Sequence, residues 1–397
     1  MKRKIVVIGT GYVGLPAALM WARAGHPVVG VDLRENLVRA INERTLLVNE
    51  RELNDLLADG AVAANLSART SPCEGDVFVI AVPTPVDALR KVADLGAVKS
   101  AIASIAPFLR SGNLVLLEST VPPLTTRTVV APMIAGLTGL DVPGDVLLAH
   151  CPERILPGNI FKEIVENDRL IGGMDAASTR SAREAYAAFV AGELVETDDL
   201  SAELAKLMEN TYRDVNIALA NEFALICEGV DVDVRAVIAM ANRHPRVDIL
   251  APGIGVGGHC IPVDPWFLKE IAPYNSRLIS TARAINDEMP GRTAARIRRA
   301  LRDVERPRIA AFGATYKRNC EDVRESPAVE VVRLLRDDGY DVVHVDPLVP
   351  GMQCEDVGAL LAQSDLAVVL VAHDAMAGEL RALQAASPRA RILFLDR

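Results

Sequence analysis

The sequence has few cysteines, and their spacing forms neither a metal site nor a disulfide framework. Six cysteines occur among 397 residues, and no two of them make a Cys-x-x-Cys pair. Disulfide scaffolds are dense in cysteine, and structural zinc sites use closely spaced cysteine and histidine ligands. We therefore expect free thiols in a reducing, cytoplasmic environment, and no bound metal.

Long apolar runs and an excess of basic residues are also missing. A membrane-spanning helix needs roughly 20 apolar residues, and no run in this chain approaches that length. The N-terminal apolar run ends at Gly9, whereas a secretory signal needs about 7–15 apolar residues. The net charge is -9, while nucleic-acid and membrane-surface binders are typically basic. We expect a cytoplasmic protein with no nucleic-acid or membrane partner.

Strand-like and helix-like segments alternate in residues 1–195. The runs KIVVIG, PVVGVDL, DVFVIAVP and NLVLLEST have the length of buried strands, and LPAALMWARAG continues the first run as a helix. Buried apolar runs that are separated by helices are typical of a parallel sheet covered on both faces. This alternation predicts an α/β domain over residues 1–195.

The rest of the chain divides into a helical segment and a second α/β domain. From Ser201 to about Met240, apolar residues recur at helical spacing with one short break. Residues 196–300 are therefore predicted to form a central helical segment that can carry a dimer interface. Strand-like runs return over residues 301–397 in PRIAAFGA, YDVVHVDP, SDLAVVLVAH and RILFLDR. The predicted fold class is α/β, with two Rossmann-like parallel-sheet domains joined by a central helical segment.

A glycine-rich motif lies between the first predicted strand and the first helix. It reads Gly9-Thr10-Gly11-Tyr12-Val13-Gly14, and Asp32 ends the second strand. In a dinucleotide fingerprint the first glycine permits a tight turn, the second admits a pyrophosphate, and the third allows close packing of helix and strand. The helix N-terminus would bind the phosphates, and Asp32 would bind the ribose, which favours NAD over NADP. A purely structural glycine turn is the alternative.

Two later strands end in threonine and proline. The segments VPTP and ESTVPP place Thr84 and Thr120 at the carboxyl ends of strands, where open α/β sheets bind their ligands. Spacing alone favours a ligand site no more than the alternative, in which threonine and proline simply form loops. The predicted cofactor-binding residues are Gly9, Gly11, Tyr12, Val13, Gly14, Asp32, Arg34, Thr84 and Thr120.

Three polar residues share one face of the central helix. Lys206, Asn210 and Arg213 are separated by four and three residues, so their side chains lie above one another. A solvated face is the usual meaning of such a stripe. The helix around the stripe has few charges, however. The sequence therefore favours a stripe that lines a site as much as one that faces solvent.

The segment GIGVGGHCIPVDPWF surrounds Cys260 with four glycines. We interpret Gly255, Gly257 and Gly258 as removing side chains that would block a substrate from a nucleophilic thiolate, with Asp264 held by the two flanking prolines. A buried, inert cysteine and a metal site using His259 are the alternatives, and neither needs four glycines. Further along, Tyr316 and Lys317 open a basic segment at a strand end, which fits either a diphosphate site or ordinary surface charge.

Together these segments resemble the UDP-glucose/GDP-mannose dehydrogenase family over essentially the whole chain. The matching segments are IGTGYVGLPAALMWARAGHPVVGVD, AVPTPV, ESTVPPLTT, CPERILPGN, AELAKLMENTYRDVNIALANE, GVGGHCIPVDP and ATYKRNCEDVRESPA. The resemblance implies an NAD domain, a helical dimerisation segment and a C-terminal nucleotide-sugar domain. It also implies a four-electron oxidation of a sugar C6 alcohol through a thiohemiacetal and a thioester on Cys260.

The resemblance also implies a role for individual residues. Lys206 and Asn210 would stabilise oxyanions or move protons, Glu153 and Asp264 would assist acid–base steps and water activation, and Thr120 would lie beside the nicotinamide. His244 and Arg246 would reach a neighbouring subunit's site in a homodimer or higher homo-oligomer. The implied residues for the UDP-sugar are Arg154, Ile155, Lys206, Asn210, Arg213, His244, Arg246, Gly253, Tyr316 and Lys317.

Two departures from the glucose-specific members bear on the substrate. Val263 stands where these enzymes commonly have Lys, and Pro157 stands where they have a second Glu. The segments CPERILPGN and GGHCIPVDPWF resemble the branch that oxidises UDP-N-acetylhexosamines, especially UDP-N-acetylmannosamine. UDP-N-acetylglucosamine and UDP-glucose are alternative substrates. A non-catalytic protein that binds NAD or nucleotide sugars, and a two-electron hydroxyacid dehydrogenase, are the rival functions.

Overall fold

The computed structural model describes residues 2–45, 51–87, 89–155, 160–386 and 391–395. The chain forms two compact units, which are described one at a time. The first comprises Met1–Met208 and Trp266–Ile271, and the second comprises Glu209–Pro265 and Ala272–Arg397. Pro157, one of the two departures from the glucose-specific pattern, lies outside the described residues.

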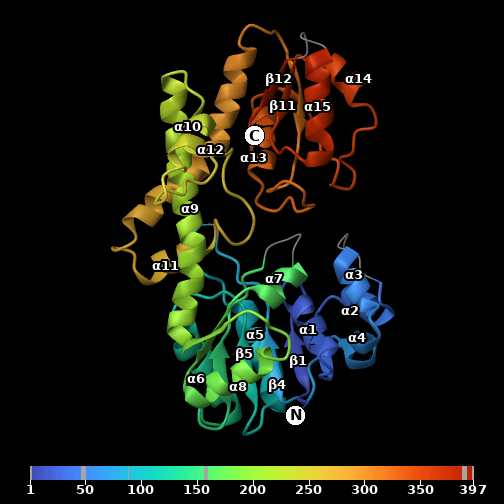
Figure 1. Ribbon diagram of the computed structural model, residues 1–397, viewed down its shortest axis with the longest axis vertical. Helices are drawn as coiled ribbons and strands as arrows, with labels where there is room; N and C mark the ends of the chain where they lie inside the picture. The colour runs from blue at the N-terminus through green and yellow to red at the C-terminus, as the bar shows by residue number, and fades with distance from the viewer. Residues whose placement is uncertain (1, 46–50, 88, 156–159, 387–390, 396–397) are drawn as a thin grey trace. The chain divides into compact units, whose positions relative to one another are not determined.

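The first unit is built on a sheet whose described strands run in the order β3-β2-β1-β4-β5-β6-β7-β8. Strands β1, β4 and β5 of this sheet are labelled in Figure 1. All neighbouring strands are parallel except β6 and β7, which pair antiparallel. The strands are β1 (Ile5–Ile8), β2 (Val28–Val31), β3 (Leu66–Arg69), β4 (Val77–Ile80), β5 (Leu114–Leu117), β6 (Leu147–His150), β7 (Arg169–Gly173) and β8 (Leu194–Asp198).

Helices cover both faces of this sheet. Alternate residues of β1 face opposite ways, so Ile5 and Val7 enter one apolar cluster while Val6 and Ile8 enter the other. The first cluster includes α1 and α8, and the second includes α5 and α6. The helical elements are α1 (Gly14–Arg23), α2 (Glu35–Glu43), α3 (Arg51–Leu57), α4 (Gly60–Asn65), α5 (Gly96–Ile105), η1 (Ala106–Phe108), η2 (Thr126–Val130), α6 (Ala131–Thr138), α7 (Ile160–Glu166) and α8 (Ala176–Tyr186).

The second unit carries a smaller sheet in the order β10-β9-β11-β12, parallel throughout its described strands. Helix α13 begins at Pro327 because the Ser326 hydroxyl caps it by accepting a hydrogen bond from the Ala328 N–H (3.2 Å). The elements of this part are β9 (Arg308–Phe312), α13 (Pro327–Asp337), β10 (Asp341–Val345), α14 (Val357–Ala362), β11 (Leu366–Val369), α15 (Asp374–Ala386) and β12 (Ile392–Phe394).

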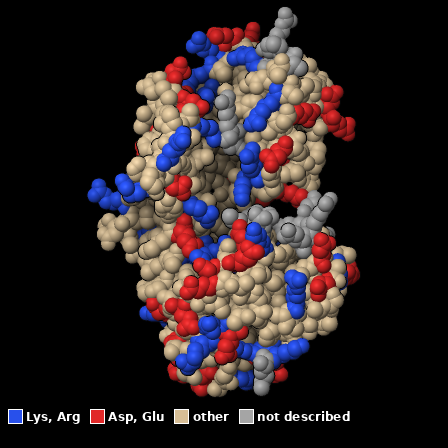
Figure 2. All heavy atoms as spheres, in the orientation of Figure 1, with Lys and Arg blue, Asp and Glu red and all other residues tan. Residues whose placement is uncertain are grey.

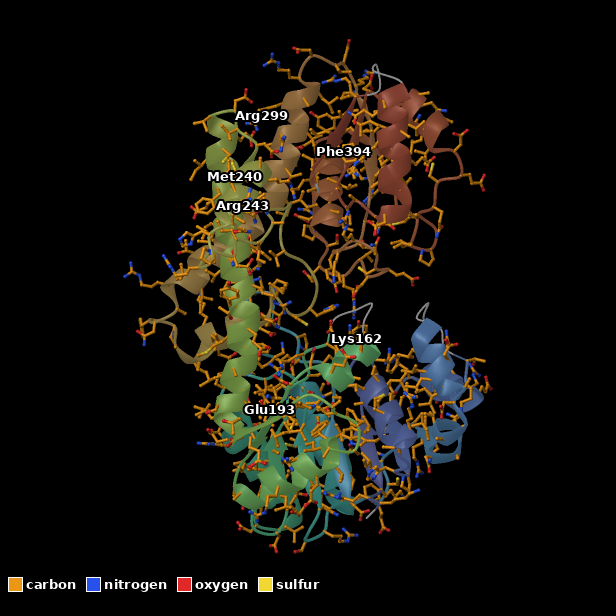
Figure 3. All side chains as sticks on the ribbon, viewed as in Figure 1. Lys162, Glu193, Met240, Arg243, Arg299 and Phe394 are labelled. Carbon is orange, nitrogen blue, oxygen red and sulfur yellow. The ribbon has the colours of Figure 1, made fainter. Side chains whose placement is uncertain are left out.

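The remaining helices lie between the two sheets in the sequence. They are α9 (Asp199–Gly229), α10 (Val234–Ala241), α11 (Asp264–Ile271) and α12 (Arg277–Leu301). In the second unit, α9 and α12 share a buried ion pair between Asp214 and Arg283 (2.6 Å). A second pair joins Glu228 to Arg299, which is labelled in Figure 3 (2.9 Å). Breaking a buried pair by removing one partner costs roughly 3–5 kcal/mol, so the Asp214–Arg283 contact fixes how these helices pack.

The predicted fold class is confirmed. The first unit has one parallel sheet with an antiparallel step, the second has another parallel sheet, and a helical segment connects them. The predicted strands of residues 1–195 are β1, β2, β4 and β5, whereas β3, β6, β7 and β8 were not predicted. The three-domain division at residues 195 and 300 stays a prediction. Among the described residues, no helix is long and apolar enough to cross a membrane.

Candidate active site

The glycine motif forms a turn that leaves room beside its middle glycine. Gly9 has a φ of +90°, and a Cβ there would lie 2.6 Å from the Ala81 carbonyl oxygen. A Cβ at Gly14 would collide with the Gly9 carbonyl, whereas at Gly11 the nearest atom would be 3.9 Å away. Helix α1 follows with no side-chain cap from Val13. The Leu15 N–H bonds the Gly11 carbonyl (3.1 Å), so what the turn offers a phosphate is mainly the positive end of the helix dipole. The turn fits a dinucleotide.

Asp32 is held at the end of β2 by its neighbours. Its Oδ2 accepts a hydrogen bond from the Thr10 N–H (3.1 Å), and both carboxylate oxygens pair with the Arg34 guanidinium at 2.9 and 3.0 Å. Partial burial opposes ionisation, but the bonds from Arg34 outweigh it and lower the pKa of Asp32. The sequence predicted both residues for the cofactor but not their ion pair. A bound ribose therefore has to share this carboxylate with Arg34 or displace it.

The threonines predicted at two strand ends lie together. The Thr84 hydroxyl donates a hydrogen bond to the Thr120 carbonyl (2.5 Å), and the Ser119 hydroxyl bonds both the N–H and the carbonyl of Val82. These bonds tie the chain after β4 to the chain after β5, at the carboxyl edge where Gly9 also lies. The first unit thus brings the predicted cofactor residues to one edge of its sheet.

Glu153 follows β6 at the same edge. Its Oε1 accepts a hydrogen bond from the Arg154 N–H (2.7 Å), and its Oε2 pairs with Arg169 (2.6 Å). The Arg154 guanidinium bonds the Asp168 carbonyl, and Ile155 packs against the apolar core. Two donors therefore fix the carboxylate of Glu153 in place.

A buried charge cluster that sequence reasoning missed stands behind Glu153. Arg169 is 4% exposed and also pairs with Glu118 (2.6 Å), whose pKa burial raises to about 7. Nearby, burial raises the pKa of the Cys151 thiol to about 12, so that cysteine stays protonated. The signal in the sequence was an arginine that opens an otherwise apolar strand, RLIGG.

Lys206 lies in the part of α9 that belongs to the first unit. Lys206 is buried, at 6% exposure, and lies near His150 at the end of β6. Burial of the His150 ring lowers the pKa of His150 to about 3, and the positive charge of Lys206 adds to this effect. In the second unit, Asn210 and Asp264 are also buried and share a hydrogen bond (2.5 Å), and Arg213 bonds the Asn210 amide oxygen. The stripe is therefore not a solvated face.

Cys260 is exposed and lies just before α11. Its carbonyl accepts hydrogen bonds from the N–H groups of Val263 (3.1 Å) and Asp264 (2.9 Å), which turn the chain into that helix. The preceding glycines lie against a neighbouring loop. A Cβ at Gly258 would be 2.9 Å from the Tyr316 ring, and one at Gly257 would be 2.7 Å from Pro327 Cδ.

This packing changes the interpretation of the glycine-rich segment. Gly257 and Gly258 were expected to clear space for a substrate, but both are needed because the segment packs tightly on the 316–327 loop. The thiol itself remains exposed. His259 lies 3.7 Å from Asp322, and among the described residues no group of His, Cys, Asp and Glu could hold a metal ion.

A buried histidine and a buried aspartate hold the loop that follows β9. Asp346 accepts hydrogen bonds from the Ala314 N–H (2.6 Å) and pairs with His373 (2.9 Å), and both side chains are fully buried. Tyr316 is partly buried beside Gly258, and Lys317 is exposed. The loop therefore presents Lys317 to solvent at the carboxyl edge of the second sheet.

The remaining predicted residues lie after α10. His244 and Arg246 are exposed and adjacent, and the Arg246 N–H donates to His244 Nδ1 (3.3 Å). The Gly253 N–H donates to the Asn221 side chain (2.9 Å), and Asn221 in turn bonds Asn286 (2.9 Å). This buried polar chain anchors the loop that leads to Cys260.

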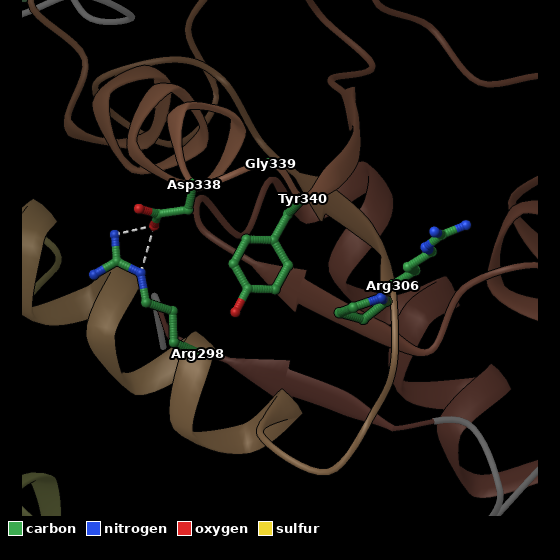
Figure 4. A pocket seen from close by; sticks show the side chains of 6 residues that line it. Arg298, Arg306, Asp338, Gly339 and Tyr340 are labelled. Carbon is green, nitrogen blue, oxygen red and sulfur yellow. Dashed lines mark hydrogen bonds and ion pairs between the residues drawn. The ribbon is translucent and has the colours of Figure 1, made fainter.

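A shallow depression of about 490 Å³ in the second unit is not part of this arrangement (Figure 4). It is lined by Arg298, Arg306, Pro307, Asp338, Gly339 and Tyr340. Arg306 precedes β9 and Tyr340 precedes β10, so the depression lies at the amino edge of the sheet, opposite the edge that binds ligands in such folds. On the face in Figure 2, acidic and basic side chains are interspersed, and neither sign forms a broad patch.

Comparison with known proteins identifies the family. Sequence models match three parts of the chain: an NAD binding domain over residues 3–190, a central domain over 200–288 and a UDP binding domain over 310–394. All three describe the UDP-glucose/GDP-mannose dehydrogenase family. The chain belongs to this family. As a member it is an NAD-dependent nucleotide-sugar dehydrogenase, and its cofactor is NAD.

Several members of the family are close relatives. A UDP-N-acetyl-D-mannosamine dehydrogenase of Methanococcus maripaludis is 46% identical, over 94% of this chain and 86% of that protein. An NDP-N-acetyl-D-galactosaminuronic acid dehydrogenase of Ralstonia nicotianae is 42% identical, over 94% and 91%. The solved structure of UDP-D-ManNAc dehydrogenase from Pyrococcus horikoshii has a TM-score of 0.92 at 37% identity, covering 99% of this chain and 95% of that one.

Proposed function

We propose that the chain oxidises the C6 alcohol of a UDP-N-acetylhexosamine, above all UDP-N-acetyl-D-mannosamine, to the uronic acid. The exposed thiol of Cys260, on a glycine segment packed against the loop of the UDP binding domain, carries this proposal. A two-electron dehydrogenase would not need such a thiol. Members whose names contain N-acetylmannosamine or N-acetylgalactosaminuronic acid support an N-acetylhexosamine.

The reaction is a four-electron oxidation that removes two hydrides from C6, and one water molecule is consumed. NAD supplies the hydride acceptor when it is bound. The alcohol first loses a hydride and a proton to give an aldehyde, to which the Cys260 thiolate adds as a nucleophile to form a thiohemiacetal. Loss of the second hydride together with the hydroxyl proton gives a thioester. Water then adds to the thioester carbonyl, the carbon–sulfur bond breaks, and the carboxylate leaves with the thiol restored.

The other predicted residues have proposed roles around this carbon. Lys206 and Asn210 stabilise the oxyanions, since a buried cation and a buried amide are strong donors away from water. Asp264 orients Asn210 through their hydrogen bond (2.5 Å), and Glu153 activates the hydrolytic water. Thr120 lies beside the nicotinamide. Arg154, Arg213, Tyr316 and Lys317 hold the nucleotide sugar.

The glucose substrate is disfavoured because Val263 replaces the lysine that is common in the glucose-specific members. A pocket that hydrogen-bonds an acetamido group leaves polar groups unpaired when a hydroxyl replaces it, which can discriminate by about 10⁴-fold. The choice of the manno epimer rests on the names of the relatives. We also propose a cytoplasmic homodimer in a pathway of polysaccharide biosynthesis.

A substrate panel tests this function. Purified protein is mixed with NAD and UDP-N-acetylmannosamine, UDP-N-acetylglucosamine, UDP-N-acetylgalactosamine or UDP-glucose, and kcat/KM is measured from NADH formation. We expect the highest kcat/KM for UDP-N-acetylmannosamine, with two NADH formed per uronic acid. A preference for UDP-glucose would overturn the substrate, and absence of turnover with every sugar would favour a non-catalytic binding protein.

The Cys260→Ser variant tests the thiol within the same assay. It should lose uronic acid formation while binding NAD normally, because the glycine motif at residues 9–14 is untouched. Cys151→Ser is the matched control, since that buried thiol has no proposed part in the chemistry. Two NADH per sugar at the wild-type rate from Cys260→Ser would contradict the thioester route.

A further inference from the structure

Arg169 joins two carboxylates inside the first unit. It opens β7 with its side chain 5% exposed, and its two terminal nitrogens contact different partners: Nη1 lies 2.6 Å from Glu153 Oε2, and Nη2 lies 2.6 Å from Glu118 Oε1. Glu118 follows β5 and Glu153 follows β6. One planar guanidinium therefore spans the ends of two neighbouring strands.

An aromatic base fixes the position of this guanidinium. The Tyr186 ring lies under it, 4.0 Å from ring centroid to Cζ, and the Tyr186 hydroxyl donates to Glu118 Oε1 (2.6 Å). Tyr186 packs in turn against Trp21, with ring centroids 5.4 Å apart. Because these side chains are fully buried, the guanidinium has little freedom to move.

Stability alone accounts poorly for this cluster. A buried ion triad is often no more stable than well-packed apolar residues of similar volume. Among the described residues, Arg169 Nε and Glu118 Oε2 of this cluster have no hydrogen-bond partner, and burial raises the pKa of Glu118 to about 7. The contact between Arg169 and Glu153 can serve the function of the protein, because Glu153 lies at the ligand-binding edge of the sheet.

We infer that Arg169 is a positioning residue for Glu153, and that it aims the carboxylate at the water that hydrolyses the thioester. Arg169 and the Arg154 N–H each bind one oxygen of Glu153. A carboxylate has about four lone-pair sites, so both oxygens can still accept a proton or bind water. The inference rests on the proposed function, because it assigns Arg169 to the hydrolytic step of that reaction.

The test is Arg169→Lys, because lysine keeps the charge but one ammonium cannot replace a fork that reaches two carboxylates. We expect kcat to fall by about 10- to 100-fold, as displacements of roughly 1 Å can do, with KM for NAD and for the UDP-sugar within a few-fold. The step that slows follows both hydride transfers. A burst of two NADH per subunit should therefore precede a slow steady state, and intact mass spectrometry should show the acyl group on Cys260.

Four further variants make the result decisive. Glu153→Gln should give the same burst and adduct, and the double variant should be no slower than the slower single variant because both remove one function. Tyr186→Phe keeps the ring under Arg169 but removes one bond to Glu118, so it should give a weaker adduct signal even if Arg169→Lys does not fold. Arg183→Lys is the matched control, since that arginine forms an exposed pair with Glu196 (3.0 Å) in the same unit.

The inference is overturned if Arg169→Lys and Glu153→Gln multiply in their effects on kcat. It is also overturned if activity falls only with the amount of folded protein, with no burst and no adduct in any variant. Failure of the proposed function has different signatures, because the wild type would then turn over no sugar, or Cys260→Ser would still form two NADH per sugar. The two failures are therefore distinguishable in the same assays.

Discussion

Asp32 and Arg34 show how one contact can change a prediction from a motif. An acidic residue at the end of β2 favours NAD, because it binds the ribose and repels a 2′-phosphate. In this chain the Arg34 guanidinium lies against that carboxylate at 2.9 Å. It neutralises part of the repulsion, and it can also pair with a phosphate. We therefore expect Arg34 to weaken the discrimination against NADP.

Removing Arg34 should sharpen the preference for NAD. In Arg34→Ala the free carboxylate of Asp32 meets a 2′-phosphate without a compensating cation. Hydrogen bonds to charged groups contribute roughly 1.5–3 kcal/mol, so the ratio of Kd for NADP to Kd for NAD should rise by about 10-fold or more. Isothermal titration calorimetry with both dinucleotides measures this ratio. An unchanged ratio, or an equal change in the exposed control Arg39→Ala, would contradict the role given to Arg34.

The glycines that the sequence identified act through a local turn, whereas the arginine that it missed has partners that are distant in the sequence. The roles of Gly9 and Gly14 depend on the backbone of a single turn, and the structure gives them the geometry that the motif predicts. Arg169 contacts partners 16 and 51 residues away. No local pattern specifies such contacts, because they arise only when β5, β6 and β7 assemble. The functional roles of all these residues stay predictions.

At the scale of elements, the segment before Cys260 is shaped by the loop on which it packs. Gly257 and Gly258 allow the two backbones to approach, and the turn after Cys260 then leads directly into α11. The position of the thiol thus depends on a contact between two loops that are more than 50 residues apart in the sequence. A small change in this packing should move Cys260 without touching it.

Gly257→Ala tests this dependence. The new methyl group would lie 2.7 Å from Pro327 Cδ, so one of the loops must shift, and overpacking of this kind costs roughly 1–3 kcal/mol. We expect kcat to fall by about 10-fold or more because a displaced nucleophile loses its alignment, while NAD affinity stays unchanged. Gly291→Ala in α12 is the matched control, since a Cβ there meets nothing within 4 Å. Full activity in Gly257→Ala would show that the contact does not position Cys260.

The elements that the sequence predicted have patterns that are local. Four-residue apolar runs specify β1, β4 and β5, all of them fully buried, and helical spacing specifies α9 and α10. In contrast, β8 reads LVETD and is only partly buried, so no apolar run marks it. The antiparallel pairing of β6 with β7 also escaped prediction, because strand direction depends on the connection between strands and not on composition.

For the whole molecule, an apolar stripe on the central helices supports a dimer. Tyr212, Leu219 and Ile226 are spaced seven residues apart on α9, so they share one face, and their exposed fractions are 59%, 43% and 63%. Met240 of α10, labelled in Figure 3, is 63% exposed. Monomeric proteins rarely expose contiguous apolar surface of this kind, and twofold dimers bury the same patch on both subunits.

The stripe gives a direct test of the oligomer. Leu219→Asp combined with Ile226→Asp would place two buried, unpaired charges in each half of the interface. We expect this variant to sediment as a monomer, while Leu137→Asp, an exposed apolar position on α6, sediments as the wild type does. A wild-type chain that is itself monomeric at micromolar concentration would remove the proposed dimer.

The proposed dimer can also be tested for an active site that both subunits share. If the exposed Arg246 completes the site of the other subunit, Cys260→Ser and Arg246→Ala are each inactive alone but complement each other. In a mixed dimer, one site carries both defects and the other carries neither. Random pairing makes about half of the dimers mixed, and by twofold symmetry one of the two sites in each mixed dimer works. Co-expression should therefore restore about a quarter of wild-type activity. If Arg246 acts within its own subunit, every site in a mixed dimer is defective. Co-expressed protein that stays inactive, yet contains mixed dimers by mass spectrometry, would therefore place Arg246 in its own subunit's site.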